Sequence, residues 1–181
     1  MLAGLAGAGK TERLEALAAA GEQVLDLEAL AGHRGSAFGG LGRPPQPAQA
    51  AFDAAVAATL ASVDPQRTLW TEDEAPFLGS LALPLALQAA IARAPVVAVD
   101  APAKARIDRL VREYGDCDRD DLLAALGRTR RRLGAARADA AAAAVRAGRL
   151  RDAVAAVLPY FDAAYRHRMA GLPRPLMGRL A

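Results

Sequence analysis

The chain has almost no cysteine and no long hydrophobic run. Its 181 residues include one cysteine, Cys117. A single cysteine excludes an internal disulfide and suits a reducing cytosol. No segment approaches the ~20 apolar residues of a membrane span, and the start lacks the pattern of a secretory leader. We therefore expect a cytoplasmic protein that does not bind a membrane.

Aromatic residues are also scarce, at 4% of the chain, whereas apolar residues reach 53%, with alanine prominent among them. The length fits one domain, or one domain with a helical extension. Its core should consist of closely packed helices with few bulky anchors. The net charge of +3 is mild, so it permits contact with a polyanion without requiring it.

What the sequence does contain is a phosphate-binding motif near its start. Residues 4–11 read Gly-Leu-Ala-Gly-Ala-Gly-Lys-Thr and match G-x-x-x-x-G-K-[ST]. The glycines let backbone N–H groups turn toward an anionic oxygen, Lys10 adds positive charge, and the Thr11 hydroxyl is placed to hold Mg²⁺. The helix that follows points its positive end at the same place. The predicted phosphate-binding residues are Gly4, Gly7, Ala8, Gly9, Lys10 and Thr11, with an ordinary glycine turn as the alternative.

Only Met1, Leu2 and Ala3 precede this motif. A phosphate loop normally follows a buried strand, and strands usually have about five or six residues. We therefore expect a truncated first strand, as in a chain cut or split at a domain junction.

Segments typical of strands alternate with helical segments over residues 1–102. Strands are predicted at 23–27, 68–71 and 96–99, and helices at 11–20, 48–62 and 84–93. This order predicts an α/β fold, a parallel sheet flanked by helices as in P-loop NTPases.

Beyond residue 103 the pattern is helical only. Helices are predicted at 103–113, 120–133, 136–147 and 149–158, and we expect residues 103–170 to form a C-terminal all-helical lobe. The last stretch, 171–181, carries two prolines and is expected to be a loose tail.

Acidic residues follow the predicted strands, at the edge of a parallel sheet where ligands bind. Mg²⁺ prefers one or two carboxylates together with phosphate oxygens. Glu72, with Thr11, is therefore the predicted metal site beside the phosphate loop. Other acids at strand ends could serve instead, or could simply cap the next segment: Glu74, Asp26 and Asp73.

A long loop rich in glycine and proline, residues 32–47, has no helical or strand period. Such loops are usually functional or disordered. Within it, His33 could shuttle a proton and Arg34 could bind phosphate through a bidentate fork. Both are candidate catalytic residues, with a surface turn as the alternative.

The predicted lobe is rich in cations and holds several aromatic residues. A basic run on one helix is either a solvated face or a contact for RNA phosphates. Two tyrosines could stack on unpaired bases or pack within the lobe. These candidate RNA-binding residues are Arg128, Arg130, Arg131, Arg132, Tyr160 and Tyr165. Cys117 lies between two aspartates, which raise a thiol pKa, so we expect a structural role for it.

Taken together, several segments resemble the P-loop domain of bacterial tRNA 2-selenouridine synthases. The matching segments are Gly4–Thr11, residues 24–39 with their Asp-Leu-Glu…His-Arg-Gly-Ser…Phe-Gly pattern, Gln46-Pro47 before a helix, Trp70–Glu74 and Tyr160–Tyr165. The block at residues 24–39 is far more specific than the phosphate loop, which many NTPases share.

This resemblance implies modification of the wobble uridine of tRNA. Members of that family geranylate a 2-thiouridine with geranyl diphosphate and then insert selenium from selenophosphate. The phosphate loop would then grip the diphosphate leaving group, Arg34 would share that task, and His33 or Glu72 would organise the base or the metal.

Members of the family also carry an N-terminal rhodanese-like domain with an essential cysteine, and this sequence contains no counterpart. Completing selenation would therefore need a separate rhodanese domain or chain. Two other hypotheses stay open: a small-molecule P-loop kinase or NTPase, and a non-catalytic remnant that binds tRNA.

Overall fold

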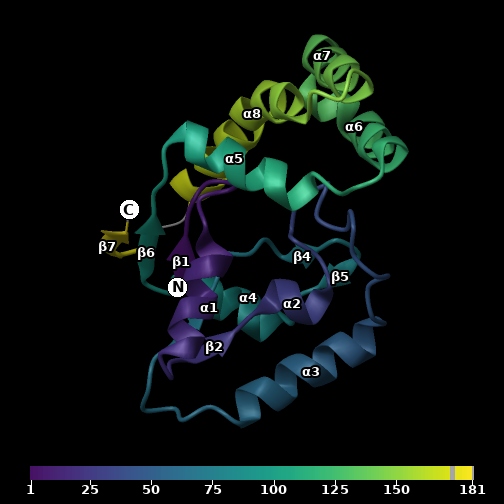
Figure 1. The fold of residues 1–181 in the computed structure, drawn as a ribbon. Coiled ribbons are helices and arrows are strands. Elements are labelled where there is room, and N and C mark those ends of the chain that lie inside the picture. Colours follow the sequence, from purple (N-terminus) through teal and green to yellow (C-terminus); the bar gives the residue numbers. More distant parts are fainter. Residues whose placement is uncertain (172–173, 181) are drawn as a thin grey trace.

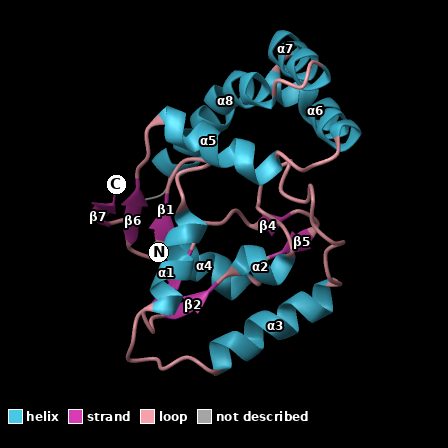
Figure 2. Ribbon diagram, viewed as in Figure 1, coloured by secondary structure: helices cyan, strands magenta, loops and turns pink. Residues whose placement is uncertain are grey.

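The protein combines a parallel sheet with a group of helices stacked above one end of it (Figure 1). The computed structural model describes residues 1–171 and 174–180. Figure 2 shows the strands confined to one half of the molecule, whereas the other half is helical. The predicted α/β class with a helical lobe is confirmed.

In the described part of the chain, five strands run parallel in two hydrogen-bonded sets. One set has the order β1-β6-β7, the other pairs β2 with β3, and an isolated parallel bridge between Leu2 and Glu72 joins them. The order across the sheet is therefore β2-β3-β1-β6-β7. The strands are β1 (Leu2–Ala3), β2 (Gln23–Leu25), β3 (Leu69–Thr71), β6 (Val96–Val99) and β7 (Leu176–Leu180).

The shortest parallel strand lies at the centre of this sheet. Strand β1 has two residues, Leu2 with 0% and Ala3 with 3% exposure. It pairs with β6 on one side, and the bridge to Glu72 lies on the other. Because the phosphate loop follows β1 directly, this central position sets the loop at the carboxyl edge of the sheet.

Four helices and a hairpin complete the α/β part: α1 (Lys10–Ala19), α2 (Leu27–Ala31), α3 (Gln49–Ala61), α4 (Leu85–Arg93), and the antiparallel strands β4 (Phe77–Leu78) and β5 (Leu81–Ala82). Sequence analysis missed both α2 and the hairpin, which are too short for a period to be visible. Helix α2 begins because the Asp26 carboxylate accepts a hydrogen bond from the Ala29 N–H at 2.8 Å. Phe52 of α3, fully buried, packs in the core beneath them.

The lobe consists of α5 (Ala103–Tyr114), α6 (Arg119–Leu133), α7 (Ala135–Arg146) and α8 (Leu150–Ala170). The first three helices lie close to the predicted bounds, whereas α8 continues through Pro159 to Ala170, well past its predicted end at residue 158. Its core contains fully buried alanines, Ala125 and Ala141. Small side chains let helices approach closely, which explains how a lobe with few aromatic residues still packs. Among the described residues no helix is both long and apolar enough to cross a bilayer.

The expected loose tail is wrong for residues 176–180, which form edge strand β7. The Asp100 N–H donates to the Leu180 carbonyl at 2.8 Å, and the Val96 N–H donates to the Pro175 carbonyl at the same distance. Pairing with β6 supplies backbone partners that local composition does not reveal. Residues 172, 173 and 181 of the expected tail lie outside the described part of the chain.

Candidate active site

The phosphate loop turns sharply between β1 and α1, and its glycines are required by the backbone. Gly7 and Gly9 have φ angles of 73° and 94°, in the left-handed region. A Cβ atom on Gly7 would also lie 2.7 Å from the carbonyl oxygen of Arg106. The loop therefore tolerates only glycine at Gly7.

The lobe holds this loop through two arginines of α5 and a tyrosine of α8. Arg106 donates from Nε to the Ala6 carbonyl at 2.8 Å, and Arg109 donates from Nη1 to the Gly7 carbonyl at 2.6 Å. The Tyr165 hydroxyl accepts a hydrogen bond from the Gly4 N–H at 2.8 Å. Two carbonyl oxygens that would repel an anion are thus engaged by guanidinium groups.

Arg106 also connects the loop to the middle of α8. Its guanidinium, 4% exposed, forms a bidentate ion pair with Asp162. One buried side chain therefore links the phosphate loop, α5 and α8.

The structure brings together the three residues predicted to bind diphosphate and metal. The Thr11 hydroxyl donates to Glu72 Oε1 at 2.7 Å, and Lys10 Nζ lies 3.9 Å from Glu72 Oε2. Lys10 also donates to the Gly4 carbonyl at 3.2 Å. Burial raises the pKa of Glu72, while Lys10 and the Thr11 hydrogen bond act in the opposite direction.

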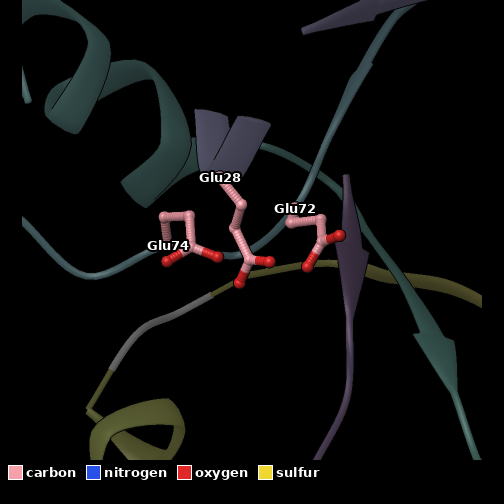
Figure 3. Close-up of side chains that lie close together, drawn as sticks. All are labelled: Glu28, Glu72 and Glu74. Atoms are coloured by element: carbon pink, nitrogen blue, oxygen red, sulfur yellow. The ribbon is translucent and has the colours of Figure 1, made fainter. Parts of the chain in front are cut away.

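Glu72 is one member of a group of three carboxyl groups. Oxygen atoms of Glu28, Glu72 and Glu74 all lie within 4.8 Å of one another, with Glu28 between the other two (Figure 3). Burial, reinforced by the Glu72 charge, raises the pKa of Glu28 to about 8 and that of Glu74 to about 7. Sequence reasoning missed Glu28 because it lies on the short helix α2. The sequence feature that could have indicated Glu28 is the Asp-Leu-Glu segment of the family pattern.

The other acids considered for the metal site have structural partners. Asp73, 4% exposed, pairs with Arg168 at 2.8 Å and with Arg174. Asp26 caps α2. These contacts explain both residues without a ligand.

His33 and Arg34 are neighbours in sequence but face different spaces. Arg34 lines the cavity above the phosphate loop, and its Nε pairs with Glu113 at 2.6 Å. His33 is 9% exposed, its Nδ1 accepts from the Gly35 N–H at 3.1 Å, and it lines a separate groove. Burial and two nearby guanidinium groups lower the His33 pKa, so its ring is neutral at neutral pH.

The phosphate loop opens into a cavity of about 470 Å³ whose lining changes in character. Near the loop it is lined by Gly7, Gly9, Lys10, Thr11, Glu28 and Glu72. Toward the lobe, apolar side chains of α6, α7 and α8 form the walls: Leu122, Leu126, Val145, Val154, Val157 and Phe161. One space therefore offers phosphate-binding groups and a hydrocarbon surface.

The predicted RNA-binding residues separate into distinct environments. The four arginines of α6 that were predicted to bind RNA are all exposed, and Arg130 pairs with Asp139 of α7. Tyr160 packs edge-on against Phe161, with 5.3 Å between ring centroids, so its ring belongs to the lobe core. Tyr165 contacts the phosphate loop.

Cys117 lies half-buried beside the lobe core. Burial is the largest influence on its thiol and raises its pKa, with Asp116 and Asp121 acting in the same direction. A thiol of this kind is poorly suited to act as a nucleophile.

Comparison with known proteins matches residues 1–170 to the family described as "tRNA 2-selenouridine synthase AAA domain". The chain belongs to this family. It is 35% identical to the tRNA 2-selenouridine synthase of Shewanella frigidimarina over 129 residues, which cover 70% of this chain and 34% of that protein. The synthase of Verminephrobacter eiseniae is 36% identical over 156 residues, covering 76% of this chain and 41% of the relative.

The synthase of Shewanella piezotolerans is 41% identical over 116 residues, or 63% of this chain and 30% of that protein. The matched region thus spans about a third of these synthases. No solved structure matches the chain.

Proposed function

We propose that this chain is the P-loop part of a tRNA 2-selenouridine synthase and transfers a geranyl group to a wobble 2-thiouridine of tRNA. The observation that carries the proposal is the cavity in which the phosphate loop faces apolar walls of the lobe. Geranyl diphosphate has a charged head and a hydrocarbon tail, and each would meet a matching surface there. Burial of the tail contributes about 0.8 kcal/mol for each methylene group removed from water.

In the proposed reaction the thiouridine sulfur attacks C1 of the geranyl chain. A carbon–sulfur bond forms, the carbon–oxygen bond to the diphosphate breaks, and pyrophosphate leaves with the bonding electrons, while the base releases its N3 proton to solvent. Charge develops on that leaving group, so the loop amides and Lys10 would stabilise the transition state. Arg34, which lines the same cavity, remains a candidate for the same task.

The residues at the head of the cavity fit a magnesium ion. The Thr11 hydroxyl lies 2.7 Å from Glu72, and the carboxyl oxygens of Glu28 and Glu74 lie near it, which is the all-oxygen environment that Mg²⁺ prefers. A bound Mg²⁺ would supply positive charge to the diphosphate. Thr11 and Glu72 would hold the ion, and the Glu28 carboxyl group would interact with it from the other side of the carboxyl cluster.

Selenophosphate would enter in a later step, after geranyl transfer. We propose that this step needs a separate rhodanese domain or chain, because the cysteine available here, Cys117, has a raised pKa and lies apart from the phosphate loop. The proposed partners are therefore tRNA and a rhodanese domain or chain. His33 stays a predicted catalytic residue, and it lines the neighbouring groove.

Ligand-induced thermal stabilisation separates this proposal from a small-molecule kinase. Geranyl diphosphate should raise the melting temperature more than pyrophosphate or ATP at equal concentration. A larger effect of ATP would favour the kinase or NTPase instead. Mass spectrometry of the wobble nucleoside after incubation with thiolated tRNA and geranyl diphosphate tests the transfer itself, and no geranylated product would favour a non-catalytic tRNA-binding remnant.

Replacing Lys10 tests the phosphate loop. Lys10→Ala should weaken pyrophosphate binding by roughly 100-fold, because a charge-assisted contact is lost, while the fold persists. The matched control is Lys104→Ala, at an exposed position on α5. Equal pyrophosphate affinity in the two variants would remove Lys10 from the site.

A further inference from the structure

A second depression, of about 860 Å³, adjoins the cavity of the phosphate loop. It lies between the loop that carries His33, the β4–β5 hairpin and helix α6. Residues that line it include Ser36, Arg43, Phe77, Arg128 and Arg132. We call this depression the basic groove.

The charge of the basic groove is mainly positive. Arg128 and Arg132 lie one turn apart on α6, so both point to the same side of that helix. Both are exposed, and within residues 1–171 and 174–180 neither forms an ion pair. Arg43 adds a third guanidinium, against one carboxylate from Asp121.

An aromatic ring lies at the same groove. Phe77 is 60% exposed although it belongs to a strand of the hairpin. The chain has few aromatic residues, and it is unusual for one of them to expose a large apolar ring to water beside cations. This combination is typical of surfaces on which unpaired bases stack while arginines hold the backbone.

The groove meets the phosphate-loop cavity at two residues. Ser36 and Arg43 line both spaces. The Arg43 Nε atom is buried and has no hydrogen-bond partner among the described residues, so it is available to an acceptor at this junction. A base displaced from a strand in the groove would pass this junction to reach the phosphate loop.

We infer that the basic groove binds a single-stranded stretch of RNA, with a base stacked on Phe77 and phosphates held by Arg128 and Arg132. The inference rests on the proposed function, in which tRNA is the substrate, and adds where its unpaired anticodon loop would lie. A duplex fits less well, because paired bases do not present their faces to a ring. Arg130, paired with Asp139, is outside this contact.

Binding of a short RNA hairpin with an unpaired loop tests the inference, with the fully paired stem as the competing ligand. Phe77→Ala should weaken hairpin binding roughly 5- to 100-fold, the range for loss of one stacked base. Leu85→Ala, at an apolar side chain with 81% exposure on α4, is the matched control.

Replacing both Arg128 and Arg132 with Gln should reduce the salt slope of binding by about 1.4, as expected for two phosphates of a single strand. Arg131→Gln, on the same helix outside the groove, should have a smaller effect.

Pyrophosphate binding, measured on every variant, separates this inference from the proposed function. Unchanged pyrophosphate affinity with weakened hairpin binding supports the groove as an RNA site. Hairpin binding equal in Phe77→Ala and Leu85→Ala, or no preference for the hairpin over the paired stem, overturns it. Tighter binding of polyglutamate than of the hairpin would identify an acidic protein partner instead and also overturn it. If the unaltered chain does not bind pyrophosphate, that result contradicts the proposed function but not the RNA site in the basic groove.

Discussion

The two parts of the phosphate-loop cavity are built in opposite ways. The charged part comes largely from one continuous segment, in which glycines force the turn and Lys10 starts a helix. The apolar part collects side chains from α5, α6, α7 and α8, and each side chain alone is an ordinary core residue. A local motif thus positions the groups proposed to bind the diphosphate, whereas the surface proposed to hold the hydrocarbon tail depends on how the lobe packs.

The largest effect is expected where the two parts are joined, at the buried pair of Arg106 and Asp162. Arg106→Met should lower the free energy of unfolding by about 3–5 kcal/mol, because the largely buried Asp162 carboxylate loses its bidentate partner and keeps only a 4.0 Å contact with the exposed Arg166. Urea denaturation measures this change. Arg130→Met, which breaks an exposed pair within the lobe, should leave stability nearly unaltered. Equal losses in the two variants would contradict a joining role for Arg106.

Filling the apolar part should separate recognition of the tail from recognition of the head. Val157→Trp places an indole ring in the cavity. It should reduce geranyl diphosphate affinity by roughly 10- to 100-fold, because the ring occupies space that the geranyl tail would fill. Pyrophosphate affinity should stay the same. Ala155→Trp, at an exposed position of the same helix, is the control. Parallel losses for both ligands would show that the two parts do not act separately.

The smallest effect is a dependence of stability on pH that arises in the charged part. The Glu28 pKa is raised from 4.5 to about 8, so between these values the folded protein holds a proton that the unfolded chain has released. Its contribution is therefore complete below about pH 4.5 and is lost as the pH rises through 8. Between pH 7 and pH 8 the loss should be on the order of 1 kcal/mol.

Thermal unfolding across this range measures that loss. Glu28→Gln should flatten the decline, whereas Glu15→Gln, at an exposed glutamate of α1, should preserve it. Mg²⁺ should restore part of the stability at pH 8, because it replaces the lost proton as a source of positive charge. If stability declines between pH 7 and pH 8 by the same amount in Glu28→Gln, the decline does not arise from Glu28.

Sequence reasoning anticipated the elements with a clear period and failed on short ones. Helices α3 to α7 and the strands around residues 24, 70 and 97 were predicted within a few residues, whereas α8 extends through Pro159 to Ala170, well past its predicted end at residue 158. Helix α2 and strand β7, each of five residues, were not. Their stability comes from a cap and from pairing with β6, neither of which leaves a repeating pattern in the sequence.

The same distinction applies to the candidate site. Lys10, Thr11 and Glu72 were predicted together because the motif and the strand end each indicate one edge of a parallel sheet. His33 and Arg34 were predicted as one pair, but the backbone turns between them and sends one side chain to the groove and the other to the cavity. Tyr165 was a candidate for RNA stacking or for packing, and its hydroxyl accepts a hydrogen bond from the N–H of Gly4, which lies 161 residues away in the chain.

The phosphate loop, the α/β class and the helical lobe follow from the sequence alone, because turn chemistry and hydrophobic period act over neighbouring residues. The cluster of Glu28, Glu72 and Glu74, the apolar walls beside Lys10 and the groove beneath α6 exist only in the folded chain. Each requires side chains from distant segments to lie within a few ångströms, and those distances are decided by how helices pack on the sheet. No local propensity encodes that packing.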